Sequence, residues 1–147
     1  MDSAAFAELL QRLTDAVCAG DGAAAAACFT AEGRYHDHFY GTFIGHGAIA
    51  CMVREHFHRD ARDLVWTTSD HTCDGERGFA CYDFRYVAKI PGSEGRAVRY
   101  AGILFCTLQD GRIAQYREMF DRGPALMQLG FPEARILKSL RKAAATR

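Results

Sequence analysis

The hydrophobic positions in the first third of the chain recur at helical spacing. The first stripe predicts a helix that is capped at Ser3 and stopped by Gly20, and it consists of Phe6, Leu9, Leu10, Leu13 and Val17. Asp21 is placed to cap a second, alanine-rich helix, which we expect to run through Phe29 and to be closed by Gly33. A third helix is expected after the loop GTFIGHG, and its predicted core stripe is Ile49, Met52, Val53, His56 and Phe57.

From residue 63 onwards the pattern changes to the alternation that is typical of strands. Turn signals at Asp74-Gly75, PGSEG and Asp110-Gly111 separate the runs DLVWTTSDHTC, FACYDFRYVAKI, AVRYAGILFCTL and RIAQYREMFD. An earlier strand is expected at RYHDHFYG, a turn or short helix at GPALMQLGF, and a terminal helix at EARILKSLRKAAA. Helices followed by hairpin-connected strands predict an α+β fold, in which helices cover one face of a curved, mainly antiparallel sheet. We expect one domain over residues 1–147, with its core at about 5–130 and a C-terminal helix and basic tail at 131–147.

Composition narrows the classes of function. The chain has 18 basic and 18 acidic residues, so its net charge is zero and nothing draws it to nucleic acid or to an anionic membrane. No apolar stretch approaches the length needed to cross a bilayer. The six cysteines are scattered without a CxxC pair, which predicts reduced, structural thiols and a cytoplasmic location.

The stretch RYHDHFYG, residues 34–41, contains the most concentrated polar chemistry. Since alternate side chains of a strand point to opposite faces, its two faces are formed by Tyr35, Asp37 and Phe39 and by His36, His38 and Tyr40. The two histidines share one face, as a metal-ligand pair would. No carboxylate or cysteine stands at a characteristic ligand spacing from the two histidines. We therefore expect His36 and His38 to be ordinary sheet residues that face away from the pocket, and we expect no metal site.

The order of elements and three segments resemble the nuclear transport factor 2-like superfamily. The segments that carry the resemblance, over residues 5–130, are LLQRLTDAVCAGDGAAAAACFTAEGRYHDH, IGHGAIACMVREHF and DGRIAQYREMFD. They are similar to the ketosteroid isomerase-like, SnoaL-like and limonene epoxide hydrolase-like members. The resemblance implies a cone-shaped, cystatin-like roll, in which the sheet wraps around the N-terminal helices and leaves an apolar cavity.

The resemblance also implies roles for inward-facing residues. Asp37 lies where ketosteroid isomerase-like members carry a general base, whose pKa an apolar cavity raises. The positions of that enzyme's hydrogen-bond donors fall on Leu13 and on Ile103 or Leu104, which cannot donate, so authentic steroid isomerisation is not expected. In the epoxide hydrolase pattern, Tyr35 and Asp37 match a water-holding pair and the remaining groups match Asp83, Arg85 and Glu118, with the order of aspartate and arginine reversed.

Two of these placements have alternatives. Asp83 and Arg85 would lie outside if the opposite face of their strand, Ala80, Tyr82, Phe84, Tyr86 and Ala88, lined the core. His56 is either a buried, hydrogen-bonded residue or a pocket acid/base.

The sequence thus predicts a SnoaL-like protein that binds a hydrophobic small molecule and performs acid/base chemistry without a cofactor: isomerisation, cyclisation, dehydration or epoxide hydrolysis. The predicted catalytic residues are Asp37, Tyr35, Asp83, Arg85 and Glu118. The predicted ligand-binding residues are Phe29, Phe39, His56, Trp66, Phe105 and Phe120. We expect a homodimer through the sheet; the alternatives are a non-catalytic ligand-binding module and a protein-interaction module of the same fold.

Overall fold

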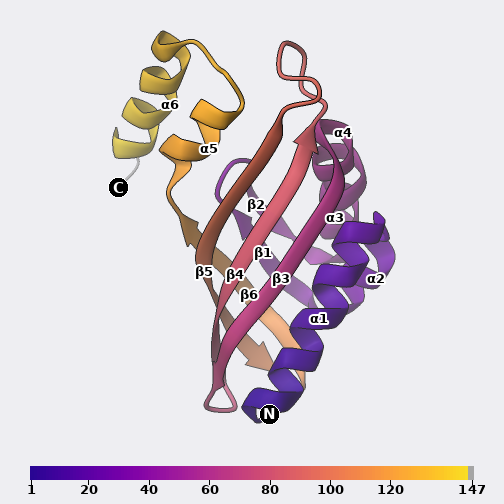
Figure 1. The fold of residues 1–147 in the computed structure, drawn as a ribbon. Helices are drawn as coiled ribbons and strands as arrows, with labels where there is room; N and C mark the ends of the chain where they lie inside the picture. Colours follow the sequence, from indigo (N-terminus) through magenta and orange to yellow (C-terminus); the bar gives the residue numbers. More distant parts are fainter. Residues whose placement is uncertain (146–147) are drawn as a thin grey trace.

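The computed structural model describes residues 1–145 and shows a curved, unclosed sheet with helices packed against its inner face (Figure 1). Within these residues the strand order is β2-β1-β6-β5-β4-β3. The strands are β1 (Phe29–Asp37), β2 (Gly41–Ile44), β3 (Ala61–Cys73), β4 (Arg77–Ala88), β5 (Ala97–Gln109) and β6 (Arg112–Phe120). Neighbouring strands are antiparallel except β1 and β6, which run parallel. The predicted α+β roll is therefore confirmed; residues 146 and 147 of the expected tail lie outside the described residues.

Helix α1 (Ser3–Ala19) supplies most of the layer that covers the sheet. Its predicted stripe is buried, and Gly20 ends it in a left-handed conformation with φ of 75°. The N-cap is Asp2 rather than Ser3, because the Asp2 carboxylate accepts a hydrogen bond from the Ala5 amide at 2.8 Å. The Ser3 hydroxyl instead accepts one from the backbone N–H of Cys73, which ties the start of α1 to the end of β3.

Helix α2 (Gly22–Ala27) is shorter than the sequence indicates. Asp21 caps it as predicted, through a hydrogen bond from the Ala24 amide. The helix ends at Ala27. Phe29, through which it was expected to run, and Gly33, which was expected to close it, both belong to β1. The register of β1 against β6 shifts between Phe29 and Arg34, so this part of the strand is irregular.

The third predicted helix is a continuous helical segment with a wider turn inside it. It consists of α3 (Gly45–Met52), the π-helical turn η1 (Val53–Phe57) and α4 (His58–Asp60). Ile49, Met52 and Val53 are buried, whereas His56 and Phe57 are half-buried, so the core stripe weakens where the π-turn rotates the side chains. The expected loop GTFIGHG is divided between β2 and the start of α3.

Two short helices follow the sheet, α5 (Arg122–Gln128) and α6 (Glu133–Ala145). In Figure 1 they lie beside β5, on the opposite side of the sheet from α1 and α2. Helix α6 coincides with the predicted terminal helix, but none of its residues is buried, and Leu137 and Leu140 are exposed.

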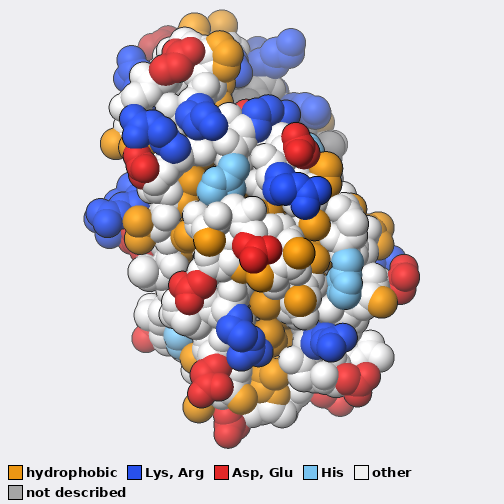
Figure 2. All heavy atoms as spheres, turned by 90° about the vertical axis from the view of Figure 1, so that its right-hand side faces the viewer, with side chains coloured by type: hydrophobic (Ala, Val, Ile, Leu, Met, Phe, Trp, Pro, Cys, Tyr) orange, Lys and Arg blue, Asp and Glu red, His pale blue; other side chains and the backbone are white. Residues whose placement is uncertain are grey.

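The surface carries charges of both signs. Figure 2, which views the molecule from the side of α1 and α2, shows acidic and basic side chains interspersed, with no area of a single sign. Among the described helices, none is both long and apolar enough to span a bilayer.

Candidate functional site

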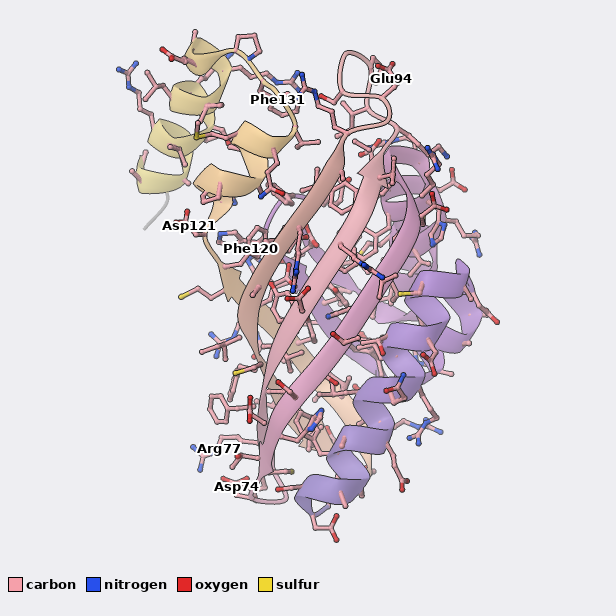
Figure 3. All side chains as sticks on the ribbon, in the orientation of Figure 1. Asp74, Arg77, Glu94, Phe120, Asp121 and Phe131 are labelled. Carbon is pink, nitrogen blue, oxygen red and sulfur yellow. The ribbon has the colours of Figure 1, made fainter. Side chains whose placement is uncertain are left out.

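A cavity opens between the inner face of the sheet and the helical segment that ends at α4. It encloses about 550 Å³ of empty space, counting the part open to solvent, and most of its wall is aromatic. Its lining residues are Tyr35, Asp37, Phe39, Tyr40, Phe57, Asp60, Ala61, Leu64, Trp66, Tyr82, Phe84, Tyr86, Ile90, Tyr100 and Glu118. In Figure 3, Asp74 and Arg77 mark one end of the sheet and Glu94 the other. The lining residues of β4 begin at its middle, with Tyr82, and continue to Tyr86, so the cavity lies toward the Glu94 end.

Asp37 is the last residue of β1 and points into this cavity. It is 6 % exposed, and its Oδ1 accepts hydrogen bonds from the backbone N–H groups of Phe39 and Tyr40, both at 2.7 Å. The chain turns at residues 38–40, so strand parity ends at Asp37 and both Phe39 and Tyr40 line the cavity. The prediction that Tyr40 faces away with the histidines is therefore wrong. His36 is still within β1, and its side chain points away from the cavity, as parity predicts. There it forms a hydrogen bond with the Thr42 hydroxyl of the neighbouring strand.

Glu118 enters the same cavity from β6. Its Oε2 accepts a hydrogen bond from the Tyr116 hydroxyl at 3.0 Å, and its Oε1 accepts a longer one from the His38 amide at 3.3 Å. Burial, and then the nearby carboxylate of Asp37, raise the pKa of Glu118 to about 8. Glu118 is therefore mainly protonated at neutral pH.

The surroundings of Asp37 differ from those of Glu118. Burial raises the pKa of Asp37 above its ordinary value, but the two short backbone hydrogen bonds and the positive groups of His36 and Arg122 act in the opposite direction. Two neighbouring carboxylates resist being charged together, so the pair favours holding one proton, and the hydrogen bonds that Asp37 accepts favour the negative charge on Asp37. The site thus holds a base and an acid side by side.

Tyr35 lies beneath this pair, two residues before Asp37 on the same strand face. Its ring stacks on Tyr116 with the centroids 4.3 Å apart, and it is 1 % exposed. Burial raises the pKa of Tyr35 well above its ordinary value, so the phenol stays neutral and retains its proton for donation.

A second polar group lies near α4. The Tyr40 hydroxyl donates to Asp60 Oδ2 at 2.6 Å, while Arg59 holds the same carboxylate through contacts of 2.6 and 2.7 Å. These hydrogen bonds from Arg59 lower the pKa of Asp60, so this carboxylate is ionised. Sequence reasoning missed Tyr40 and Asp60, because the turn at 38–40 and the end of α4 leave no periodic signal.

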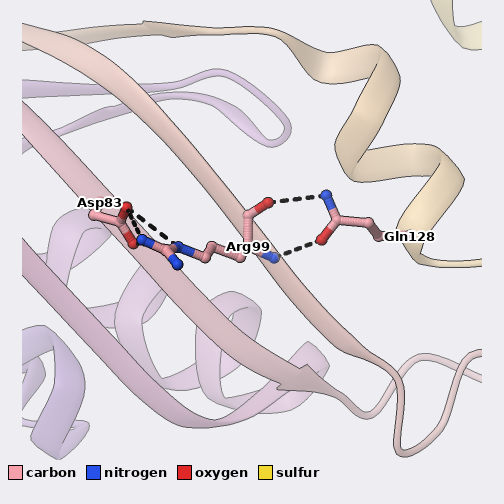
Figure 4. Close-up of polar contacts among 3 residues, drawn as sticks. All are labelled: Asp83, Arg99 and Gln128. Carbon is pink, nitrogen blue, oxygen red and sulfur yellow. Dashed lines mark hydrogen bonds and ion pairs between the residues drawn. The ribbon is translucent and has the colours of Figure 1, made fainter.

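Asp83 and Arg85 do not reach the cavity, which corrects the placement expected for them as catalytic residues. The alternate residues Tyr82, Phe84 and Tyr86 line it, so Asp83 and Arg85 lie on the outer face of β4. There Asp83 accepts a two-pronged ion pair from Arg99, with the closest contact at 2.7 Å (Figure 4).

The backbone of the same Arg99 is joined to α5. Its N–H donates to Gln128 Oε1 at 2.8 Å, and its carbonyl accepts from Gln128 Nε2 at 2.9 Å (Figure 4). The edge of β5 that β6 leaves unpaired thus anchors α5 through Arg99, while the outer face of β4 and β5 carries an exposed ion pair.

The predicted ligand-binding residues divide into three groups. Phe39 and Trp66 line the cavity. Phe120 lies behind it, stacked on Tyr100 with centroids 4.1 Å apart, and Phe29 is buried in the core. Two residues are placed elsewhere: Phe105 contacts Phe79 and Arg117 on the outer face, and His56 packs between the rings of Tyr40 and Phe43.

The sequence signal for the missed wall was present in β4. The aromatic alternation of Tyr82, Phe84 and Tyr86 is this signal, and the structure places that face inward. Among residues 1–145, no group of three or more histidine, cysteine or carboxylate side chains is arranged to hold a metal ion.

The fold agrees with comparisons to known proteins. Residues 10–116 match the SnoaL-like domain, so the chain belongs to that family. No curated protein matches the sequence.

Solved structures match over nearly the whole chain. TsrD from Streptomyces laurentii is 24% identical with a TM-score of 0.75, over 88% of this chain and 98% of TsrD. A putative polyketide cyclase from Xanthomonas campestris is 21% identical with a TM-score of 0.69, over 88% and 99%. An LEH-like epoxide hydrolase from M. tuberculosis is 16% identical with a TM-score of 0.69, over 96% and 98%. These structural similarities confirm the predicted fold, but a shared fold does not assign a specific activity to the chain.

Proposed function

We propose that the protein binds a hydrophobic small molecule in the aromatic cavity and transfers protons on it with Asp37 and Glu118, without a cofactor. The observation that carries this proposal is the buried carboxylate pair, in which one member is hydrogen-bonded as an anion and the other is held as an acid. Two titratable groups with separated pKa values are the usual basis of concerted acid/base catalysis.

Asp37 is the base of the pair. Its Oδ1 is taken by the amides of Phe39 and Tyr40, which leaves Oδ2 as the oxygen that meets a substrate proton. Glu118 is the acid, and it returns a proton at a second position of the substrate. Tyr35 supports the site from below as a neutral hydrogen-bond donor.

The reaction type follows from what the cavity contains. Leu13 and Leu104, at the positions of the isomerase donors, are fully buried apolar residues, and Ile103 is exposed, so the steroid isomerase arrangement has no support. Asp83 and Arg85, two of the five residues matched to the epoxide hydrolase pattern, lie outside the cavity, so that pattern is incomplete there. The resemblance to a putative polyketide cyclase is compatible with an isomerisation, cyclisation or dehydration that begins with loss of a proton from carbon.

Hydrogen–deuterium exchange tests this proposal directly. Small ketones such as cyclohexanone and acetophenone are incubated with the protein in D₂O, and loss of the α-proton signals is followed by NMR. We expect exchange above the buffer rate with the wild type and with the outer-face control Asp83→Asn, and loss of it with Asp37→Asn and Glu118→Gln. Exchange that survives Asp37→Asn contradicts the proposal. Binding with no exchange in the wild type favours a second candidate, a protein that sequesters a ligand.

We also propose a homodimer through the outer face of the sheet and a cytoplasmic location. The dimer is supported by the exposed apolar side chains of Phe79, Ile103 and Met119 on β4, β5 and β6. The location is supported by the six cysteines, all of which are unpaired. Sedimentation equilibrium of the wild type and of Ile103→Glu tests the interface: we expect a dimer and a monomer, respectively.

A further inference from the structure

Two of the buried polar atoms that lack a hydrogen-bond partner belong to the wall of the cavity. Among the described residues, the buried side-chain nitrogen and oxygen atoms without a partner are His56 Nδ1, Trp66 Nε1, the Tyr82 hydroxyl and Arg122 Nε. Only Trp66 and Tyr82 of this set line the cavity. They are 6 % and 4 % exposed.

An unpaired buried donor is costly, so it calls for a partner that the protein chain does not provide. Leaving such a group unsatisfied costs about 1–3 kcal/mol. The indole N–H donates only and cannot be satisfied by a neighbouring donor. Burial, and then the nearby carboxyl groups of Glu118 and Asp37, raise the pKa of Tyr82, so the phenol keeps its proton. Its hydroxyl makes no hydrogen bond of ordinary geometry but lies near Glu118, so a substrate oxygen competes with that carboxyl for the donor.

The two donors are close to each other and to the carboxylate pair. The rings of Trp66 and Tyr82 come from the adjacent strands β3 and β4, with centroids 6.2 Å apart. The Tyr82 ring crosses over Gly102 of the next strand, where an added Cβ would lie 2.7 Å from the hydroxyl. Gly102 therefore permits the hydroxyl to reach the side of the cavity at which Glu118 enters from β6.

We propose that Trp66 Nε1 and the Tyr82 hydroxyl donate hydrogen bonds to a single acceptor oxygen of the substrate, a carbonyl oxygen held beside Asp37 and Glu118. This inference rests on the proposed function and names the substrate class of the same site. The hydrogen-bond donors of the isomerase pattern are absent at Leu13 and Leu104. In this proposal, Trp66 of β3 and Tyr82 of β4 take their place.

The chemistry balances with the groups already described. Asp37 Oδ2 removes a proton from the carbon next to the carbonyl, and the electron pair of the broken C–H bond moves onto the carbonyl oxygen. The resulting enolate oxygen receives two hydrogen bonds from Trp66 and Tyr82, which strengthen as its charge develops. If the ketone carries a β,γ double bond, the enolate is a dienolate, and Glu118 delivers its proton to the γ-carbon while the double bond moves into conjugation with the carbonyl. The proton that Asp37 removed then passes to Glu118, which restores the starting state without an added reagent.

A pair of isosteric probes tests the donor pair. Cyclohexanone and methylenecyclohexane differ in having an oxygen or a CH₂ group at the same position. We expect cyclohexanone to bind at least about tenfold more tightly, since two hydrogen bonds of ordinary strength distinguish the probes. The chain contains a single tryptophan, so its one indole N–H signal reports the contact, and we expect this signal to move downfield with cyclohexanone only.

Variants locate the effect. Tyr82→Phe and Trp66→Phe should each reduce the preference for cyclohexanone about threefold or more. The control Asp83→Asn changes the neighbouring residue on the outer face of the same strand, outside the cavity, and should leave the preference unchanged. Equal binding of the two probes, an unmoved indole signal, or no binding of cyclohexanone overturns the inference.

The binding result is independent of catalysis. A ketone preference that depends on Trp66 and Tyr82, together with an absence of deuterium exchange, supports the donor pair and contradicts the proposed proton transfer. Deuterium exchange that requires Asp37 but is unaffected by Tyr82→Phe and Trp66→Phe supports the proposed proton transfer and contradicts the donor pair.

Discussion

Asp37 and Glu118 stand at the same level of two neighbouring parallel strands. The register of β1 and β6 pairs Tyr35 with Tyr116 and His36 with Arg117, and the next residues of the two strands are Asp37 and Glu118. Strands in a sheet are about 5 Å apart, so this register alone brings the two carboxyl groups into one small volume. A sheet made only of hairpins would not pair the first strand with the last in this way.

The activity of the site should follow a bell-shaped pH profile. Turnover requires Asp37 ionised and Glu118 protonated, so the acidic limb falls above the ordinary aspartate range and the basic limb lies near pH 8, where Glu118 loses its proton. The profile of deuterium exchange against pH measures both limbs. A profile without an alkaline limb near pH 8 would contradict the role of Glu118 as the acid.

The stability of the protein should fall as the pH rises through the same interval. The pKa of Glu118 is higher in the folded chain than the usual 4.5, so the folded state binds more protons than the unfolded state between about pH 4.5 and 8, and unfolding becomes easier as the pH increases. At about 1.4 kcal/mol per pKa unit, the Glu118 contribution is at most a few kcal/mol. Asp37 adds an effect of the same sign. Urea unfolding at pH 5 and pH 8 measures the difference, which should shrink in Glu118→Gln.

Replacing Asp83 should have little effect on the cavity. Asp83→Asn weakens the ion pair with Arg99 on the outer face, where solvent screens the charges. We expect the midpoint of thermal unfolding to change by no more than about 2–4 °C, and ligand binding and turnover to remain at the wild-type level. A loss of turnover in a folded Asp83→Asn protein would restore the role that the sequence suggested.

Adding one methyl group at Gly78 should destabilise the core. A Cβ at this position of β4 would lie 2.5 Å from the ring of Phe6, which is fully buried in α1. We expect Gly78→Ala to lower the free energy of unfolding by about 1–3 kcal/mol. Gly47→Ala is the matched control, because a Cβ in that turn of α3 meets no atom within 4 Å. A neutral Gly78→Ala would show that α1 shifts freely on the sheet.

The sequence predicted the elements whose periodicity is strong. The stripe of α1, the hairpin turns and α6 follow from patterns that local physics determines, such as the left-handed conformations of Asp110 and Gly111 at the last hairpin. The inward placement of Asp37 and Glu118 was also predicted, because parity and the family resemblance both favour it, and both residues line the cavity.

The remaining features depend on where regular structure stops. Asp83 and Arg85 have inward and outward alternatives that alternation cannot separate, since it defines two faces without saying which one meets the helices. Tyr40 and Asp60 lie in a turn and at the end of a helical segment, so only the folded chain shows that they meet. The π-turn at 53–57 likewise moves His56 out of the stripe that the helical period predicts.

The amides of Phe39 and Tyr40 have a consequence for how this family member can diversify. They hold the charge of Asp37 through the main chain, whereas the side chains of the same two residues form the wall that meets the ligand. Nearly any amino acid except proline supplies the same N–H group. Specificity at these two positions can therefore drift during evolution, or be redesigned, while the base beside them retains its reactivity.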